Sequence, residues 1–325
     1  MKILYGIQLN GNGHITRSIE LISILKEKGY EVDIITSGNN SNLDIPFKVK
    51  KHFQGFSIYY NKFGSIDWIK SISSSKLIRL LKDIKYDVSE YDLVISDFEP
   101  VSAWSARMCK VKSIGISNQC SLISKNTPKF KRKFISKLFI KYFAKCDDYI
   151  GLHYQSYDDY IQLPFISRFF LENKISDKNF YLIYLPSLKL DFIIKQVKLY
   201  KNIKFKIYSD EVEEYTNFDN IEINKLNKSA FQKDILDCTG VITASGFSTT
   251  SEALILGKKL WSIPLKGQYE QLSNSISLKE MGIYTKDFNI TNLGSWLISY
   301  DRIDYKWENP IYNIVEKIIK TYGDN

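Results

Sequence analysis

The sequence lacks the features that define several broad classes of protein. It has no run of about 18 apolar residues, so no membrane-spanning helix is expected, and no signal-peptide pattern precedes its first apolar segment. Its four cysteines are scattered, with no Cys-x-x-Cys pair, which argues against a disulfide framework and against a zinc site. We therefore expect a cytoplasmic protein with reduced thiols.

Acidic residues are missing from one long segment, although the whole chain carries a formal net charge of only +9. Lys125 to Lys145 contains lysine and arginine interleaved with aromatic and aliphatic residues, and no acid. Such a segment is typical of a helix that lies on an anionic membrane, at the inner face of the cell membrane in this case. A helix packed on its own domain with a solvated lysine face is the alternative, and both stay open. No motif for binding nucleic acid accompanies the charge.

Strand and helix patterns alternate along the 325 residues, which predicts an α/β protein with parallel sheets. The length suits two domains. We place the first at residues 1–167, the second at 168–308 and a final helix at 309–325. In the first domain, strands are expected near 2–7, 31–36, 92–96, 113–117 and 149–153. In the second, they are expected from 181 and near 204–208, 221–225, 240–244 and 260–263.

The most informative segment begins with the apolar run 240–244, which predicts a buried parallel strand. Gly246 follows, and Ser248, Thr249 and Thr250 then open a helix that contains Glu252. Free backbone N–H groups and the helix dipole attract an anion such as a diphosphate at a helix start. Glu252 lies about one turn farther on, where its carboxylate would accept hydrogen bonds from two vicinal ribose hydroxyls. An ordinary capped helix is the alternative for this segment alone.

A second glycine-rich turn follows the first predicted strand, at Gly11-Asn12-Gly13-His14. The turn lies at the carboxyl end of a parallel sheet, where open α/β sheets bind ligands. His14 is one of only three histidines, and an imidazole can take a proton from a hydroxyl at physiological pH. Arg17, one turn farther along, either faces a phosphate or is solvated.

A general base needs a group that orients it, and the strand near 92–96 ends in the carboxylates of Asp97 and Glu99. Such a carboxylate fixes the tautomer of the imidazole and stabilises its protonated form. Asp97 is the first candidate and Glu99 is its rival, although either could instead cap the helix that begins at Pro100. Asn118 follows the next strand and is a candidate for the acceptor side together with Glu99.

Together these motifs resemble GT-B glycosyltransferases, above all the UDP-glycosyltransferases and the enzyme that adds N-acetylglucosamine to lipid I in cell-wall synthesis. The resemblance rests on Gly246 to Glu252 and on later residues of the same half of the chain. Those later residues are Gly257, Pro264, Glu270, Gln271, Asn274 and Gly282. It is tight over roughly forty residues and loose over the rest. In one respect the chain departs from it, because Ala244-Ser245 stands where the UDP-glycosyltransferases carry a histidine.

The resemblance implies two Rossmann-like domains whose parallel sheets face an interdomain cleft, with the acceptor on the first domain and the nucleotide-sugar donor on the second. It implies His14 and Asp97 as the catalytic pair and a final helix that returns to the first domain. Glu252 would hold the ribose, and Glu270 and Gln271 the hydroxyls of the donor sugar. The diphosphate would be held through Ser248, Thr249, Thr250 and Gly246, with Gly11, Gly13, Arg17 and Ser187 also on the donor side.

The implied activity is inverting, metal-independent transfer of a hexosyl or N-acetylhexosaminyl group from a nucleotide sugar. The donor is expected to be a UDP-sugar, and the acceptor a hydroxyl of a cell-surface glycan or lipid-linked molecule. The metal-binding Asp-x-Asp signature of the other large glycosyltransferase fold is absent, and no cofactor is expected beyond the nucleotide-sugar co-substrate.

Three other functions are weighed against this one. A UDP-sugar epimerase of the same fold would bind the same nucleotide without an acceptor. A dinucleotide oxidoreductase is disfavoured because Thr16 replaces the third glycine of Gly-x-Gly-x-x-Gly. A non-catalytic protein that binds sugar nucleotides remains the third alternative.

Overall fold

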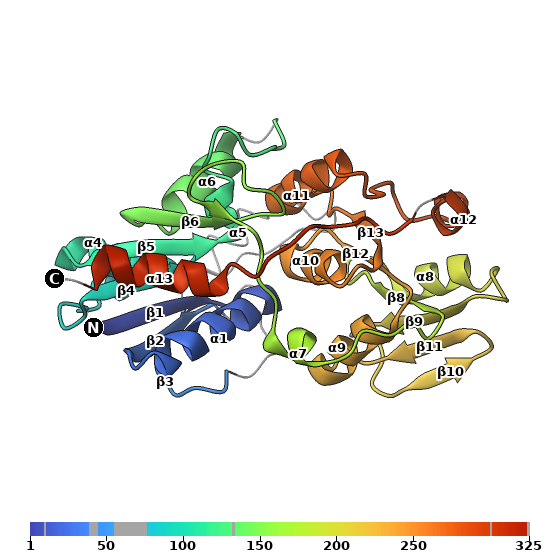
Figure 1. The fold of residues 1–325 in the computed structure, drawn as a ribbon, viewed down its shortest axis with the longest axis horizontal. Helices are drawn as coiled ribbons and strands as arrows, with labels where there is room; N and C mark the ends of the chain where they lie inside the picture. Colours follow the sequence, from blue (N-terminus) through green and yellow to red (C-terminus); the bar gives the residue numbers. More distant parts are fainter. Residues whose placement is uncertain (10, 39–44, 55–76, 132–133, 300, 324–325) are drawn as a thin grey trace. The chain divides into compact units, whose positions relative to one another are not determined.

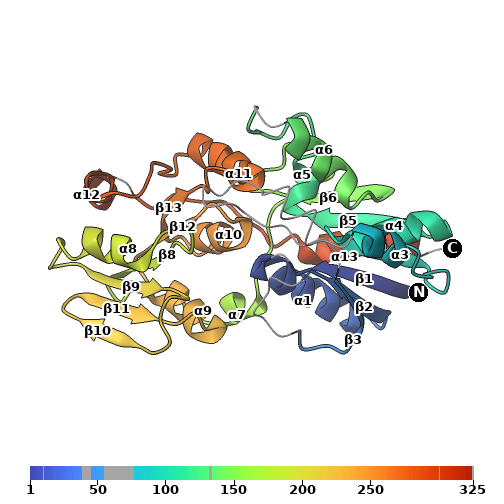
Figure 2. The same ribbon diagram turned by 180° about the vertical axis from the view of Figure 1, so that it is seen from behind.

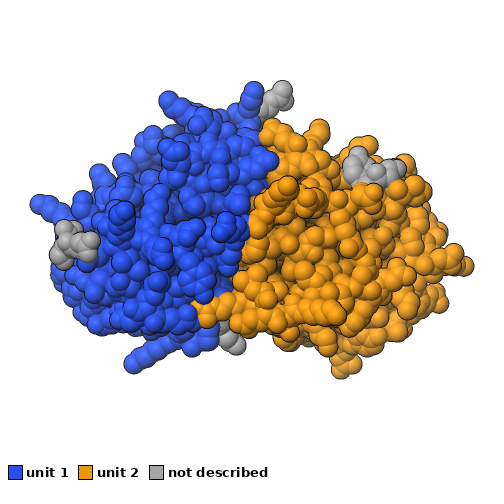
Figure 3. Space-filling view, viewed as in Figure 1, with its two compact units in different colours: residues 1–165, 308–325 blue, residues 166–307 orange. Residues whose placement is uncertain are grey.

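The computed structural model describes residues 1–9, 11–38, 45–54, 77–131, 134–299 and 301–323. Within it the chain forms two compact units, each of which is built around its own sheet. Unit 1 comprises residues 1–165 and 308–325, and unit 2 comprises residues 166–307 (Figure 3). The chain therefore leaves unit 1 after residue 165 and returns to it at residue 308.

Unit 1 contains a parallel seven-stranded sheet with the order β3-β2-β1-β4-β5-β6-β7 (Figure 1). The order reverses beside β1, so the strands on its two sides are reached in opposite directions along the chain. In an open α/β sheet this reversal creates a ligand site beyond the carboxyl ends of the strands. The strands are β1 (Lys2–Gln8), β2 (Glu31–Ser37), β3 (Val49–Phe53), β4 (Leu93–Asp97), β5 (Lys112–Ser117), β6 (Asp148–Leu152) and β7 (Ile161–Gln162).

The helices of unit 1 cover this sheet, and their ends follow local sequence signals. For example, α4 begins with proline at its first position and ends at Lys110, whose left-handed φ of 58° stops the helix. The helix α13 packs against α1 (Figure 1), and α3 and α4 come to the front in the reverse view (Figure 2). The helices are α1 (Asn12–Glu27), α3 (Leu77–Asp83), α4 (Pro100–Cys109), α5 (Asn118–Ser121), α6 (Phe134–Phe143) and α13 (Ile311–Tyr322).

Unit 2 contains a six-stranded sheet with the order β10-β11-β9-β8-β12-β13, in which only the pairing of β10 with β11 is antiparallel. The strands are β8 (Phe180–Tyr184), β9 (Lys204–Tyr208), β10 (Thr216–Phe218), β11 (Ile221–Asn224), β12 (Gly240–Ala244) and β13 (Lys259–Ile263). The helices are α7 (Arg168–Glu172), α8 (Leu190–Val197), α9 (Lys228–Asp237), α10 (Phe247–Ile255), α11 (Tyr269–Glu280) and α12 (Ile290–Ser299).

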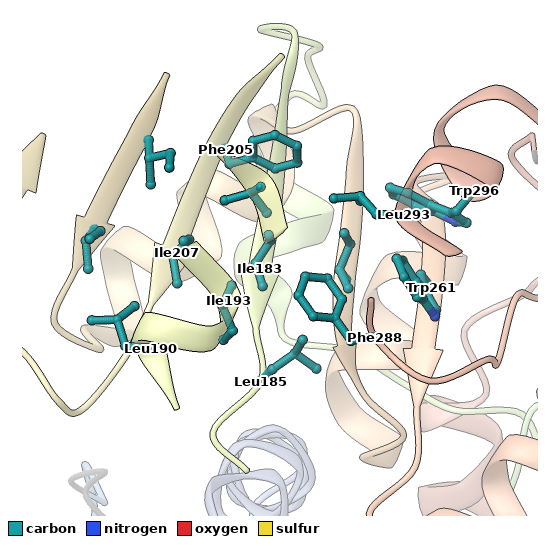
Figure 4. Close-up of a cluster of buried hydrophobic side chains, with 14 of the residues drawn as sticks. Ile183, Leu185, Leu190, Ile193, Phe205, Ile207, Trp261, Phe288, Leu293 and Trp296 are labelled. Atoms are coloured by element: carbon teal, nitrogen blue, oxygen red, sulfur yellow. The ribbon is translucent and has the colours of Figure 1, made fainter. Parts of the chain in front are cut away.

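The core of unit 2 packs two tryptophans against aliphatic side chains from the neighbouring strands (Figure 4). Trp261 and Trp296 are fully buried, with ring centroids 5.8 Å apart. Their indole N–H groups donate to backbone carbonyls, of Lys286 and Leu260 respectively, so their burial leaves no polar atom unsatisfied. This core supports β12 and β13, whose carboxyl ends carry the polar turns discussed below.

The prediction of an α/β protein with two parallel sheets is confirmed, with one antiparallel edge strand in unit 2. Three short strands were not predicted: β3, β7 and β10. β3 has mostly exposed, charged residues, β10 is exposed throughout, and β7 has only two residues, so none shows an apolar run. No helix among the described residues is long and apolar enough to cross a membrane.

Candidate functional site

In unit 1, two strand ends and one helix start converge on His14. β1 and β4 are adjacent and parallel, with Ile7 opposite Asp97, and α1 begins four residues beyond β1. Gly11 precedes the helix with a φ of 119°, a backbone conformation that favours glycine. His14 is therefore not in a free turn but in the first turn of α1, next to the end of β4.

The carboxylate of Asp97 is fully buried and is contacted by three side chains of α1. Its Oδ1 lies 2.8 Å from His14 Nδ1 and 2.5 Å from Arg17 Nη2, and Arg17 Nε and Ser18 Oγ each donate to Oδ2 at 3.1 Å. Burial by itself raises the pKa of Asp97, but the Arg17 guanidinium and the His14 ring outweigh it and hold this pKa below its usual value. The carboxylate is thus ionised, and it orients the imidazole.

The side chain of Arg17 is not solvated, which excludes one of its two interpretations. Its side chain is only 7% exposed, and its guanidinium forms an ion pair with Asp97. The predicted contact of Arg17 with a donor phosphate stays a prediction. Sequence reasoning missed the pairing of Arg17 and Ser18 with Asp97, since the residues are about 80 positions apart and only the register of β1 with β4 brings them together.

Glu99, the rival of Asp97, caps helix α4. Its carboxylate accepts hydrogen bonds from the backbone N–H groups of Val101 and Ser102, at 2.8 and 2.5 Å, and from the hydroxyl of Ser37 at 2.6 Å. The side chain is fully buried, and burial raises its pKa despite these hydrogen bonds. The structure therefore separates the two carboxylates, with Asp97 on the imidazole and Glu99 on the helix start. A contact of Glu99 with an acceptor stays a prediction.

Asn118, the other candidate for the acceptor side, is buried at the end of β5. Its side-chain N–H₂ group donates to the carbonyl of Leu152 at 3.0 Å, while its Oδ1 is buried without a hydrogen-bond partner. A buried amide oxygen without a partner is costly, so the atom is a candidate for contact with a ligand. A contact of Asn118 with an acceptor stays a prediction.

In unit 2, α10 begins three residues after the end of β12. Gly246 is the residue before the helix, and no side chain caps the helix start. A Cβ atom at Gly246 would meet no atom within 4 Å, so the backbone there is accessible. The hydroxyls of Ser248 and Thr249 form no hydrogen bond with any described residue, whereas Thr250 donates its hydroxyl proton back to the carbonyl of Gly246. Free N–H groups and two free hydroxyls suit a phosphate group.

Glu252 lies in the next turn of α10, and its carboxyl group is buried without a hydrogen bond to any described residue. The residue is only 8% exposed. Burial raises the pKa of Glu252 to about 8, against a small opposing effect of Lys228. A buried carboxyl group without protein partners is expected to find them in a bound ligand.

The remaining predicted donor residues lie in α11, after β13, and in the turn after β8. Gln271 is buried, and its side-chain oxygen accepts a hydrogen bond from the backbone N–H of Leu265 at 3.1 Å, which fixes this turn. Asn274 donates to the carbonyl of Ser245 at 3.1 Å and so connects α11 to the end of β12. Glu270 is half-buried in the first turn of α11, and Ser187 is exposed after β8. Contacts of Glu270, Gln271 and Ser187 with a donor sugar or phosphate stay predictions.

The expectation of a site without a metal ion stays a prediction. Among the described residues, no group of three or more histidine, cysteine, aspartate or glutamate side chains is arranged to hold a metal ion. The two strand-end groups instead offer a base with its orienting carboxylate in unit 1, and a helix start with free hydroxyls and a buried carboxyl in unit 2.

Comparison with known families gives one clear match. The family described as glycosyl transferase family 1 matches residues 1–300, which is most of the chain. No curated protein matches the chain in sequence.

Solved structures with a similar fold are distant in sequence. UGT89C1 from Arabidopsis thaliana, complexed with UDP, is 13% identical, with a TM-score of 0.53 over 99% of this chain and 94% of that chain. The spinosyn rhamnosyltransferase SpnG, complexed with thymidine diphosphate, is 10% identical, with a TM-score of 0.57 over 91% and 92%. A putative UDP-N-acetylglucosamine 2-epimerase from Listeria monocytogenes is 10% identical, with a TM-score of 0.64 over 100% and 97%. These similarities show that the chain has the two-domain GT-B fold.

Proposed function

The chain belongs to glycosyl transferase family 1, and from that premise we propose that it transfers a sugar with inversion from a nucleotide sugar, without a metal ion, to a hydroxyl group. The observation that carries the proposal is the 2.8 Å contact between His14 and Asp97 at the strand ends of unit 1. A histidine held by an ionised carboxylate is the arrangement that a general base requires.

On the acceptor side, His14 would remove the proton of the attacking hydroxyl through its Nε2 atom. Asp97 occupies the side of Nδ1, and no described residue forms a hydrogen bond with Nε2. As the proton moves to the ring, the Asp97 carboxylate stabilises the imidazolium that forms. Attack from the side opposite the leaving diphosphate inverts the anomeric carbon.

On the donor side, the start of α10 would bind the diphosphate and Glu252 the ribose. The helix dipole, the free backbone N–H groups and the hydroxyls of Ser248 and Thr249 would stabilise the negative charge of the leaving diphosphate, which is the work that a metal ion performs in other enzymes. Glu252 would accept hydrogen bonds from two ribose hydroxyls. Two structural relatives were solved with UDP and with thymidine diphosphate, which supports a nucleoside diphosphate as the donor's leaving group, with UDP as our first choice.

The test is turnover with a panel of UDP- and thymidine-diphosphate sugars, hexoses and N-acetylhexosamines alike, with and without EDTA. We expect hydrolysis or transfer with at least one donor, no loss with EDTA, and a loss of about 10²–10⁴-fold in His14→Ala. Donor binding should survive in that variant, measured as the thermal shift caused by the nucleotide. Full transfer activity in His14→Ala would show that the mechanism is wrong.

A sugar-nucleotide epimerase is the second candidate, because an epimerase is among the structures with the same fold. An epimerase converts the donor alone and needs no acceptor. Incubation with the nucleotide sugar alone separates the two functions, since an epimerised sugar nucleotide points to isomerisation and a free or transferred sugar points to glycosyl transfer.

We also propose that the acceptor is lipid-linked or part of a cell-surface glycan, and that the protein works at the cytoplasmic face of the cell membrane. The support comes from α6, inside the segment from Lys125 to Lys145, of which Arg132 and Lys133 lie outside the described residues. Phe139 and Phe143 of α6 pack on Phe98, next to Asp97. A different arc of the helix exposes large apolar side chains, which are Phe134, Ile135, Leu138 and Tyr142.

The helix α6 packs on unit 1 and also keeps an apolar face in solvent beside Lys137 and Lys141, so both interpretations of this segment stay open. An exposed apolar arc with flanking lysines suits the surface of an anionic bilayer. Co-sedimentation with phosphatidylglycerol vesicles should succeed, and replacing Phe134, Ile135 and Leu138 by alanine should weaken it. Alanine at the similarly exposed Leu81 and Met108 is the matched control. Equal binding of both variants would contradict a role of α6.

A further inference from the structure

The carboxylate of Asp97 has every acceptor position occupied, and one of its partners is the guanidinium cation of Arg17. His14 Nδ1 and Arg17 Nη2 both contact Oδ1, while Arg17 Nε and Ser18 Oγ donate to Oδ2. A carboxylate has about four lone-pair sites, so these four contacts fill them. A catalytic pair of histidine and aspartate needs only the first contact. The function of the guanidinium therefore calls for an explanation of its own.

The contacts decide which nitrogen of His14 carries the proton. His14 Nδ1 lies 2.8 Å from Asp97 Oδ1 and 3.1 Å from Arg17 Nη2. If Nδ1 accepted a hydrogen bond from Arg17, its lone pair would face the lone pairs of an ionised oxygen at hydrogen-bond distance. A proton on Nδ1 removes this repulsion and makes a charge-assisted hydrogen bond to Asp97. Arg17 then donates to Asp97 rather than to the ring, and Nε2 keeps its lone pair.

The charges that surround the ring are few. Tyr5 of β1 and Cys120 of α5 are buried near Asp97, and burial raises the pKa of both, so both are neutral. Burial also raises the pKa of Glu99, which caps α4. Arg17 and Asp97 are the charged groups that contact the His14 ring directly, and their charges oppose each other.

We propose that Arg17 is the positioning residue of the site: it fixes Asp97 by a two-point contact and offsets its negative charge. An imidazole beside an unopposed carboxylate is protonated over a wider pH range, because the carboxylate stabilises the imidazolium. The two-point contact holds Asp97 against the ring of His14, so the neutral ring carries its proton on Nδ1 and keeps a free lone pair on Nε2. The inference rests on the proposed function only in naming His14 the base.

The first test is ¹⁵N NMR of the full-length protein, which has only three histidines. His14 is assigned by the loss of its signals in His14→Gln. In the neutral ring of the unsubstituted protein we expect the proton on Nδ1. A proton on Nε2 would overturn the proposal, because Arg17 would then donate to the ring and block its function as a base. This measurement needs no substrate, so its failure is distinct from the failure of the proposed function.

The second test follows protonation of the His14 ring with pH in variants. In Arg17→Gln the charge is lost, and we expect the ring to take up its second proton about one pH unit higher. Arg17→Lys keeps the charge but loses the two-point contact, so its titration should stay near that of the unsubstituted protein. Ser18→Ala removes a neutral donor to the same carboxylate and is the matched control, with no shift expected.

The acid limb of the pH profile of kcat/KM should move in the same direction in Arg17→Gln, and transfer near pH 6 should fall more than transfer near pH 8. Equal titration of His14 in Arg17→Gln and in the unsubstituted protein would reduce Arg17 to a structural residue. If Arg17→Gln does not fold, the tautomer in the unsubstituted protein still decides the matter, because a proton on Nε2 would overturn the proposal.

Discussion

The two strand-end groups of the chain differ in how far the protein itself satisfies them. In unit 1, His14, Asp97, Arg17 and Ser18 are bonded to one another. In unit 2, within the described ranges, Ser248, Thr249 and the carboxyl of Glu252 have no hydrogen-bond partner. The first group is arranged before any substrate binds, as a base should be. The second is the kind of site that a ligand completes.

The two buried carboxyl groups express this difference as opposite pKa shifts. Burial acts on both, but the guanidinium of Arg17 and the ring of His14 bring the pKa of Asp97 below its usual value. Burial raises the pKa of Glu252 to about 8 because it has no comparable partner. The same substitution of a carboxyl by an amide should therefore have opposite effects on stability in the two units.

The largest expected effect is that of Asp97→Asn. The neutral amide leaves the buried charge of Arg17 unpaired, which costs about 3–5 kcal/mol of unfolding free energy. Urea denaturation followed by circular dichroism measures it. In the double variant Arg17→Met with Asp97→Asn, most of the loss should be recovered, since no unpaired charge remains. A stable Asp97→Asn would mean that the ion pair contributes little.

Glu252→Gln should instead stabilise the free protein at alkaline pH. Between the pKa of about 4.3 in the unfolded chain and about 8 in the native state, the native state binds the extra proton, so stability falls as pH rises through this window. The glutamine does not titrate, and its advantage should grow by roughly 2–4 kcal/mol from pH 5 to pH 8.5. Thermal melts at both pH values measure it. A constant difference between variant and unsubstituted protein would refute the raised pKa.

Alanine at two glycines, one in each unit, should have smaller effects that contrast the two units. A Cβ at Gly6 would lie 2.1 Å from Ser102 Oγ, so Gly6→Ala should lower the free energy of unfolding by about 1–3 kcal/mol through overpacking, which urea denaturation measures.

Gly246 has open space and an ordinary φ of −70°, so Gly246→Ala should fold normally. Its new methyl group would nonetheless crowd a bound diphosphate, and we expect nucleotide affinity to fall about tenfold, or 1.4 kcal/mol. Calorimetric titration with UDP compares Gly246→Ala with the unsubstituted protein, and unchanged affinity would place the phosphate elsewhere.

The pH dependence of nucleotide binding should be an effect of similar size. If the ribose hydroxyls bind the ionised form of Glu252, affinity should rise about tenfold between pH 7 and pH 9, as the carboxyl with its pKa of about 8 loses its proton. The terminal phosphate of UDP is already ionised in this range, because its second pKa is near 6. Glu252→Gln should bind more weakly and without this dependence. A parallel dependence in both proteins would assign it to another group.

The sequence predicted the strands that carry the site because buried parallel strands are continuous apolar runs. β12 and β9 have the predicted bounds, and the others differ by one or two residues. Val49–Phe53 could not be predicted in the same way, since its lysines and histidine face solvent at the edge of the sheet. Edge strands lack the burial that makes a strand visible in a sequence.

The candidate pair of His14 and Asp97 was accessible from the sequence because both follow predicted strands. The choice between Asp97 and Glu99 was not accessible from the sequence, since it depends on which carboxylate caps the start of α4. The environment of Arg17 was also hidden: a residue three positions after a histidine on a helix shares its face, but the partner on β4 follows only from strand order. Long-range register is what a single sequence does not state.

The return of the chain to unit 1 at residue 308 has a consequence for biosynthesis. Every residue of unit 2 is translated before α13, whose buried Ile311, Ile314, Val315 and Ile318 complete the packing of unit 1 beside α1. Unit 1 thus begins first and is completed last, and the nascent polypeptide must leave the apolar surface that α13 covers exposed while unit 2 is made. A chaperone that binds this surface during translation would be displaced from it only when α13 has emerged.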